Sequence, residues 1–239
     1  MKNIKTRFVK TIALAMSAVL LCGSFALVGC SSNNAGTSGS SSAKSSAATS
    51  AAATSASSEA TMTGIHHVQM TVEGYDPITI ELDADAAPIT VTNFVNLVND
   101  GFYNGLTFYR FEQGFCMQGG SAGNSASSTN DGLTPIVGEF SSNGYNNPLA
   151  DDFHEGVVAM ARTSVKDSAT STFFVTLGPA SSVGPALDGD YAAFGIIDAD
   201  GMAIVNQIVA DYLPYATANM GMITDEAHQA KIESITVID

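Results

Sequence analysis

The sequence has no tryptophan, only three cysteines among 239 residues, and nine lysine and arginine residues against 23 aspartate and glutamate residues. Charged residues make up 13%, about half the share of roughly 25% that is typical of globular domains. Nonspecific binding to nucleic acid requires a cationic surface that displaces counterions from phosphate, so the net charge of −14 argues against that class of function. Three cysteines exclude a disulfide framework, while 45% hydrophobic residues suffice for a sizeable core.

The few basic residues are unevenly distributed. Four of them lie in the first ten positions, where they precede an apolar run from Thr11 to Leu21. From residue 61 onward, four cations stand against 22 acids, a net charge of −18 that repels nucleic acid and other acidic partners. These four cations, each of which is a candidate for a specific role, are Arg110, Arg162, Lys166 and Lys231.

The N-terminus is typical of an export signal, because a basic start is followed by an apolar run without a polar face. The run ends in Leu27-Val28-Gly29-Cys30, which resembles the bacterial lipobox. We therefore expect residues 1–29 to be a lipoprotein signal peptide and Cys30 to carry the lipid that anchors the chain to the membrane. An ordinary secretory signal with an incidental cysteine is the alternative. Cys22 would leave with the signal, so Cys116 would be the one remaining thiol, and no intramolecular disulfide could form.

A low-complexity stretch follows the lipobox. Residues 31–60 contain 12 serines and nine alanines, a composition that cannot bury enough apolar area to offset the ordering entropy. We interpret residues 30–62 as a flexible tether with a reach on the order of 30 Å, and residues 63–239 as the folded domain.

Short apolar runs separated by turn residues dominate the folded part, with two stretches at helical spacing. Asp76-Pro77 predicts a turn between the first two strands. The stretch from Pro88 to Asp100-Gly101 and the stretch from Gly201 to Tyr212 predict helices. Many short strands with two amphipathic helices favour a β-barrel with helical covers. The expected strands are His66–Val72, Ile78–Leu82, Leu106–Tyr109, Gly114–Gln118, Val157–Ala161, Thr172–Thr176, Ala192–Ile197 and Ile232–Ile238.

One segment, from Phe108 to Gly120, places an arginine in an aromatic-rich run before an apolar strand that ends in Gln-Gly-Gly. It resembles the central motif of the cyclophilin-type peptidyl-prolyl cis-trans isomerases. Five further segments resemble motifs of that family in the same order, which makes the resemblance specific. They are Ala87 to Phe94, Gly101 to Leu106, Gly156 to Arg162 (the family's "GVVSMA" strand), Ser171 to Phe174 ("SQFF") and Leu187 to Gly195 ("LDG…FG").

The resemblance implies a closed eight-stranded antiparallel β-barrel capped by two α-helices, with the active site in a groove on the outer face. It implies an isomerase that needs no cofactor, because the barrier to X-Pro rotation arises from amide resonance and no nucleophile or metal is required. We expect no metal site either, since the adjacent His66 and His67 point to opposite faces of a strand.

The same resemblance assigns candidate site residues. Arg110 would stabilise the prolyl nitrogen as it pyramidalises, Phe115 would seat the proline and Gln118 would bond the substrate backbone. From the residues alone, Arg110 could instead be a structural arginine paired with an acid such as Glu112, and Cys116 a buried, inert thiol. The substrate-binding residues implied by the resemblance are Met160, Ala161, Arg162, Thr172, Phe174, Leu187 and Tyr191, with only the main chain of Arg162 carried over.

The sequence departs from the family pattern at several positions in this region. Ala186 stands where a tryptophan is common, Tyr191 where many members have histidine, and Thr172 where many have glutamine. Tyr109 replaces the common histidine before the arginine, and Cys116 replaces an apolar residue.

We therefore predict a monomeric isomerase that is lipid-anchored outside the cytoplasm. It would bind proline-containing peptides and unfolded exported proteins. A binding module or chaperone with low turnover, using the same groove, is the alternative. A solute-binding lipoprotein, which usually has two larger α/β lobes, is disfavoured because the folded part is short and rich in strands.

Overall fold

The computed structural model describes residues 60–127 and 132–239. The predicted signal peptide, Cys30 and most of the predicted tether lie outside these residues. In the described part, no helix is both long enough and apolar enough to cross a membrane.

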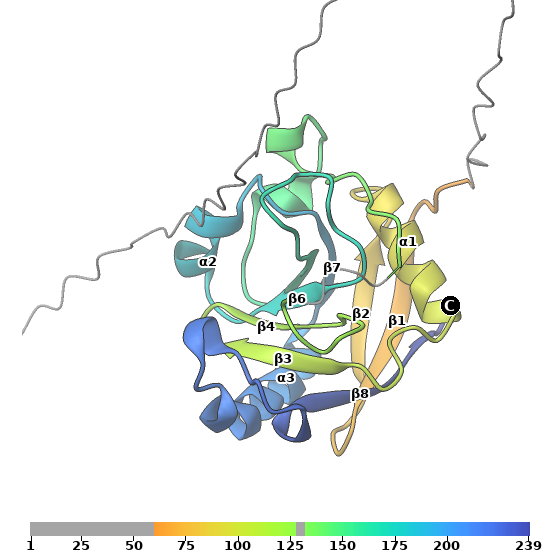
Figure 1. Cartoon of the computed structure of the whole chain (residues 1–239). Coiled ribbons are helices and arrows are strands. Elements are labelled where there is room, and N and C mark those ends of the chain that lie inside the picture. Colours follow the sequence, from red (N-terminus) through yellow and green to blue (C-terminus); the bar gives the residue numbers. More distant parts are fainter. Residues whose placement is uncertain (1–59, 128–131) are drawn as a thin grey trace, which may run out of the picture. The chain divides into compact units, whose positions relative to one another are not determined.

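Eight strands form a closed antiparallel barrel, in the order β1-β2-β7-β5-β6-β4-β3-β8 (Figure 1). β1 and β2 form the hairpin expected around Asp76-Pro77, with Met70 opposite Ile78. The first strand also pairs with the last, which closes the barrel. The strands are β1 (Ile65–Val72), β2 (Ile78–Asp83), β3 (Thr107–Glu112), β4 (Cys116–Gly119), β5 (Val157–Met160), β6 (Phe173–Thr176), β7 (Ala193–Ile197) and β8 (Ala230–Val237).

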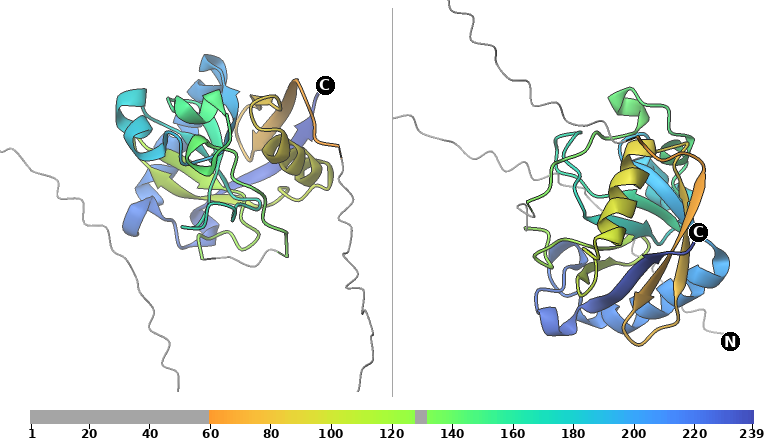
Figure 2. Two further views of the ribbon diagram at one scale, coloured as in Figure 1. Left: turned by 90° about the horizontal axis from the view of Figure 1, so that it is seen from above. Right: turned by 90° about the vertical axis from the view of Figure 1, so that its right-hand side faces the viewer.

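Two amphipathic helices, α1 (Pro88–Asn99) and α3 (Ala199–Tyr212), cover the barrel, one near each end (Figures 1 and 2). Their apolar faces bury residues such as Phe94 and Val205 in the same cluster that fills the barrel. The fold expected from the resemblance is thereby confirmed. The α3 N-terminus has an acidic cap, because the Asp198 side chain accepts the Gly201 N–H at 2.8 Å.

The cap of α1 is different, because Ala87 at its N-terminus has no side chain that can accept a hydrogen bond. The carboxylate of Glu139, about fifty positions later in the sequence, takes this place. It accepts the backbone N–H groups of Ile89 (3.0 Å) and Thr90 (2.7 Å) and the Thr90 hydroxyl (2.7 Å), and it is 2% exposed. A buried acid from a distant loop therefore fixes the start of the helix.

A third helix, α2 (Ala180–Leu187), was not expected from the sequence. Gly184 and Pro185 lie within it, and both are poor helix formers, so the local pattern favours a loop. Packing of Val183 and Leu187 stabilises the short helix beside the barrel wall.

The alternation of side chains along the central strands produces two apolar clusters. On β5, Val158 and Met160 join the barrel core, whereas Val157 and Ala159 join a second cluster on the other side of the sheet. β6 divides in the same way, with Phe173 in the barrel core and Phe174 in the second cluster. The second cluster, which α2 covers in part, forms the floor beneath the groove described next.

Candidate active site

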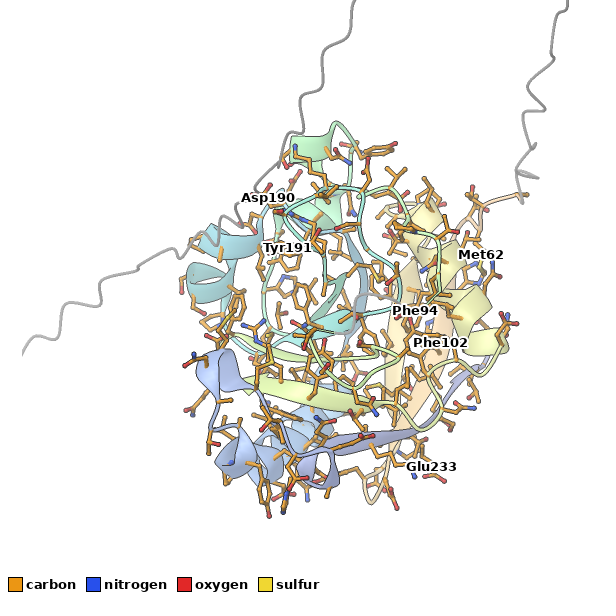
Figure 3. All side chains as sticks on the ribbon, viewed as in Figure 1. Met62, Phe94, Phe102, Asp190, Tyr191 and Glu233 are labelled. Atoms are coloured by element: carbon orange, nitrogen blue, oxygen red, sulfur yellow. The ribbon has the colours of Figure 1, made fainter. Side chains whose placement is uncertain are left out.

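A groove of about 610 Å³ runs along the outer face of the barrel wall, within the size range of ligand sites. Strands β3, β4 and β6 and the end of α2 contribute residues to it, as does the turn Ala218–Met222. In Figure 3, Tyr191 lies on the α2 side of the domain, whereas Phe94 and Phe102 lie on the α1 side. The predicted site residues that line the groove are Arg110, Phe115, Gln118, Ala161, Arg162, Thr172, Phe174, Leu187 and Tyr191.

Met160 does not line the groove, which corrects its assignment as a substrate-binding residue. Its side chain is 1% exposed and belongs to the barrel core, because its position on β5 has the same parity as Val158. Cys116 on β4 has the opposite orientation and lines the groove.

Arg110 on β3 is held by hydrogen bonds from three of its nitrogens. Nε donates to the Met220 carbonyl oxygen (2.8 Å), Nη1 donates to Gln118 Oε1 (3.0 Å), and Nη2 donates to Glu112 Oε2. The guanidinium carbon lies 5.5 Å from the ring centroid of Phe115. A guanidinium carries five N–H groups, so three fixed donors leave two, one on each terminal nitrogen, for a bound molecule.

The ion pair with Glu112 is therefore present, but it does not remove Arg110 from the groove. The arginine residue is 8% exposed and still lines the groove. The structural and functional interpretations of this arginine are compatible, because the pair holds the side chain at the groove wall.

An apolar surface lies next to the guanidinium. Phe174 is 4% exposed and packs edge-on against Tyr191, with ring centroids 5.7 Å apart. Leu187, at the end of α2, and Phe115 complete this surface. An apolar seat beside a fixed guanidinium suits a small ring such as that of proline, whose nitrogen is the only polar atom in the ring.

Ala161 and Arg162 both make contacts within the protein. The Ala161 N–H donates to the Thr172 carbonyl oxygen at 2.9 Å, so it is occupied by the protein itself. The Arg162 guanidinium lies over the Tyr191 ring (4.7 Å) and the Phe140 ring (5.2 Å), and its Nε donates to the Asp190 carbonyl oxygen (2.7 Å). Its side chain thus braces the groove wall.

The Cys116 thiol is buried, and burial raises its pKa to about 12. A thiol with that pKa has almost no thiolate at neutral pH, so it fits the expected inert role. In the described residues, no group of three histidine, cysteine, aspartate or glutamate side chains could hold a metal ion.

Sequence reasoning assigned no role to the turn Ala218–Met222. Met220 contributes its carbonyl to Arg110, and both Met220 and Met222 line the groove. Met220 has a left-handed backbone (φ 62°), and Gly221 follows at φ 75°, where a Cβ would collide with the Phe111 carbonyl oxygen. The glycine between Met220 and Met222 was the only local indication of this turn in the sequence.

Comparisons with known proteins agree with this geometry. Residues 67–237 match the model of the family described as cyclophilin type peptidyl-prolyl cis-trans isomerase/CLD. The chain is 38% identical over 143 residues to peptidyl-prolyl cis-trans isomerase A of Dickeya dadantii (59% of this chain, 70% of the relative). It is 35% identical over 167 residues to peptidyl-prolyl cis-trans isomerase B of Escherichia coli (67% and 93%).

The fold has a counterpart among solved structures. A cyclophilin type peptidyl-prolyl cis-trans isomerase of Cryptosporidium parvum superposes with a TM-score of 0.60 at 21% identity, covering 74% of this chain and 99% of that one. The barrel, its outer groove and the sequence matches define one class of protein, a peptide-bond isomerase. The chain belongs to the cyclophilin-type peptidyl-prolyl cis-trans isomerase family.

Proposed function

We propose that this chain isomerises X-Pro bonds in exported proteins, outside the cytoplasmic membrane, and that a lipid on Cys30 anchors it there. One observation carries the catalytic part: a guanidinium fixed by three hydrogen bonds lies beside an apolar seat and keeps two N–H groups available. The sequence of the first thirty residues supports the location.

The chemistry follows from the amide bond. Rotation about an X-Pro bond is slow because resonance opposes it, with a barrier of about 18–20 kcal/mol. As the bond twists, the prolyl nitrogen pyramidalises and gains a localised lone pair. An Arg110 N–H donates to that lone pair, an interaction that strengthens only in the twisted state and therefore lowers the barrier.

The neighbouring groups hold the substrate for this step. The seat of Phe115, Phe174 and Leu187 fixes the proline ring, so the other side of the bond rotates. Gln118 Nε2 uses one N–H within the protein and has a second for a substrate carbonyl.

Catalysis is tested by NMR line broadening of a short X-Pro peptide with the full chain. We expect faster cis-trans exchange with the native chain, and at least a hundredfold slower catalysed exchange with Arg110→Ala. Lys231→Ala, which removes a surface cation that does not line the groove, serves as the control and keeps the native exchange. Peptide shifts without faster exchange would indicate a binding module and contradict the isomerase.

The location is tested by fractionating cells that express the native chain or Cys30→Ala. The proposal expects the native chain in the membrane fraction and the variant in soluble fractions, with Cys22→Ala unchanged as the control. Equal distribution of all three chains would contradict a lipid anchor at Cys30.

A further inference from the structure

Tyr109 occupies an irregular position in β3. Phe108 pairs with Gly119 and Arg110 pairs with Gln118, so Tyr109 is an extra residue with no counterpart on β4, a β-bulge. The bulge changes the alternation of side chains. Phe108 and Phe111 enter the barrel core, while the consecutive residues Tyr109 and Arg110 both line the groove. A regular strand would have sent one of these two inward.

The Tyr109 hydroxyl contacts the side chain of Gln118. The tyrosine is 2% exposed, and its hydroxyl accepts a hydrogen bond from Gln118 Nε2 at 3.1 Å. The Thr172 side chain also lines the groove. Burial raises the pKa of Tyr109, although Gln118, Thr172 and Arg110 act in the opposite direction. The hydroxyl therefore stays neutral over the pH range in which proteins are usually assayed.

Arg110, which can only donate, sets the orientation of the Gln118 amide, and the Tyr109 hydroxyl accepts the Nε2 group that this orientation directs toward it. With Nε2 directed at Tyr109, the oxygen Oε1 faces Arg110 and accepts its Nη1 at 3.0 Å. A flipped amide would place the NH₂ group against the guanidinium, so that two donors would face each other. The orientation of Gln118 in turn fixes one edge of the guanidinium.

We propose that Tyr109 is a positioning residue of the active site, which holds Gln118 and through it Arg110 in the geometry for isomerisation. The inference rests on the proposed role of Arg110, so the same assay includes Arg110→Ala.

The decisive variant is Tyr109→Phe, which removes only the hydroxyl. Its matched control is Tyr103→Phe, since Tyr103 is also buried and its hydroxyl donates to the Ser171 carbonyl oxygen (3.0 Å), but it does not line the groove. Catalysed exchange of an X-Pro peptide is measured by NMR with the full chain, and peptide affinity by chemical-shift titration.

We expect Tyr109→Phe to slow catalysed exchange by about three- to tenfold, with affinity changed less than twofold. We expect Tyr103→Phe to catalyse exchange at the native rate, even if it lowers the melting temperature as much as Tyr109→Phe does. If Tyr109→Phe lowers the melting temperature, exchange is measured at a temperature at which the native chain and both variants stay folded.

A second comparison separates positioning from a general effect on the fold. If Tyr109 acts through Gln118, the double variant Tyr109→Phe, Gln118→Ala should be no slower than Gln118→Ala alone. The inference is overturned if the effects of the two changes multiply in the double variant. It is also overturned if Tyr109→Phe catalyses exchange as fast as the native chain. A native chain that does not accelerate exchange contradicts the proposed function instead.

Discussion

Arg110 and Glu112 lie two residues apart on β3 and form an ion pair at the groove, with Nη2 donating to Oε2. The carboxylate side chain is 41% exposed, whereas that of the arginine is 10% exposed. The negative charge thus approaches the guanidinium from the solvent side and leaves the face toward the groove open. This arrangement holds the cation, but it also reduces its positive potential at a bound prolyl nitrogen.

Removing that charge should increase the rate. Glu112→Gln keeps an oxygen that can accept from Nη2 but carries no charge, so Arg110 presents a stronger field to the twisted amide. We expect kcat/KM for an X-Pro peptide to rise about two- to fivefold, since an exposed pair is worth about 1 kcal/mol or less. The measurement is catalysed exchange at low and at high ionic strength.

Glu73→Gln provides the control for this change. Glu73 pairs with Lys231 at 3.7 Å on the surface and does not line the groove. Its loss changes the net charge by the same amount and should leave kcat/KM unaltered. If Glu112→Gln catalyses exchange more slowly than the native chain, orientation of Arg110 by the Glu112 charge matters more for the rate than the gain in positive potential.

The cap of α1 leads to a prediction about stability. Glu139→Ala leaves the Ile89 and Thr90 N–H groups and the Thr90 hydroxyl without their acceptor in a buried place. We expect a loss of about 2–3 kcal/mol of unfolding free energy, measured by urea denaturation. Asp198→Ala, which removes the exposed cap of α3, should cost about 1 kcal/mol. Equal losses of unfolding free energy in the two variants would show that burial does not increase the contribution of a cap to stability.

Most of the fold could be predicted from the sequence, because apolar alternation, turn residues and helical spacing are local. It was harder to predict which individual side chains point into the barrel and which point toward the groove. The run from Val157 to Ala161 is apolar throughout, so nothing in it distinguishes Met160, which enters the barrel, from residues on the groove side. The bulge at Tyr109 depends on the partner strand and leaves no mark in the sequence. Helix α2 depends on packing that outweighs the low helix propensity of Gly184 and Pro185.

The left-handed backbone of Met220 leads to a second prediction about stability. A side chain with a Cβ is unfavourable at φ 62°, and asparagine tolerates that conformation better. Met220→Asn should therefore raise the unfolding free energy by about 0.5–1 kcal/mol, since the exposed side chain contributes little packing. Urea denaturation at constant m value measures the change.

Met222→Asn is the matched control in the same turn. Met222 also lines the groove, but its φ is −77°, which any residue adopts. The same chemical change there relieves no strain and should give no gain. A gain in both variants would assign the effect to loss of a methionine rather than to backbone conformation.

The buried thiol predicts a pH dependence with a definite sign. Burial raises the pKa of Cys116 from the ordinary 9.0 to about 12. Below pH 9 the thiol is protonated in both the folded and the unfolded chain, so its contribution to stability is complete. Above pH 9 the unfolded chain releases the proton first, and the folded state loses about 1.4 kcal/mol per pH unit until the folded thiol also titrates. At pH 10.5 the loss is therefore about 2 kcal/mol.

Cys116→Ala lacks this loss, while all other titrating groups are common to both chains. Urea denaturation at pH 8 and pH 10.5 should show a larger drop for the native chain than for the variant, and equal drops would mean that the folded thiol ionises as readily as the unfolded one.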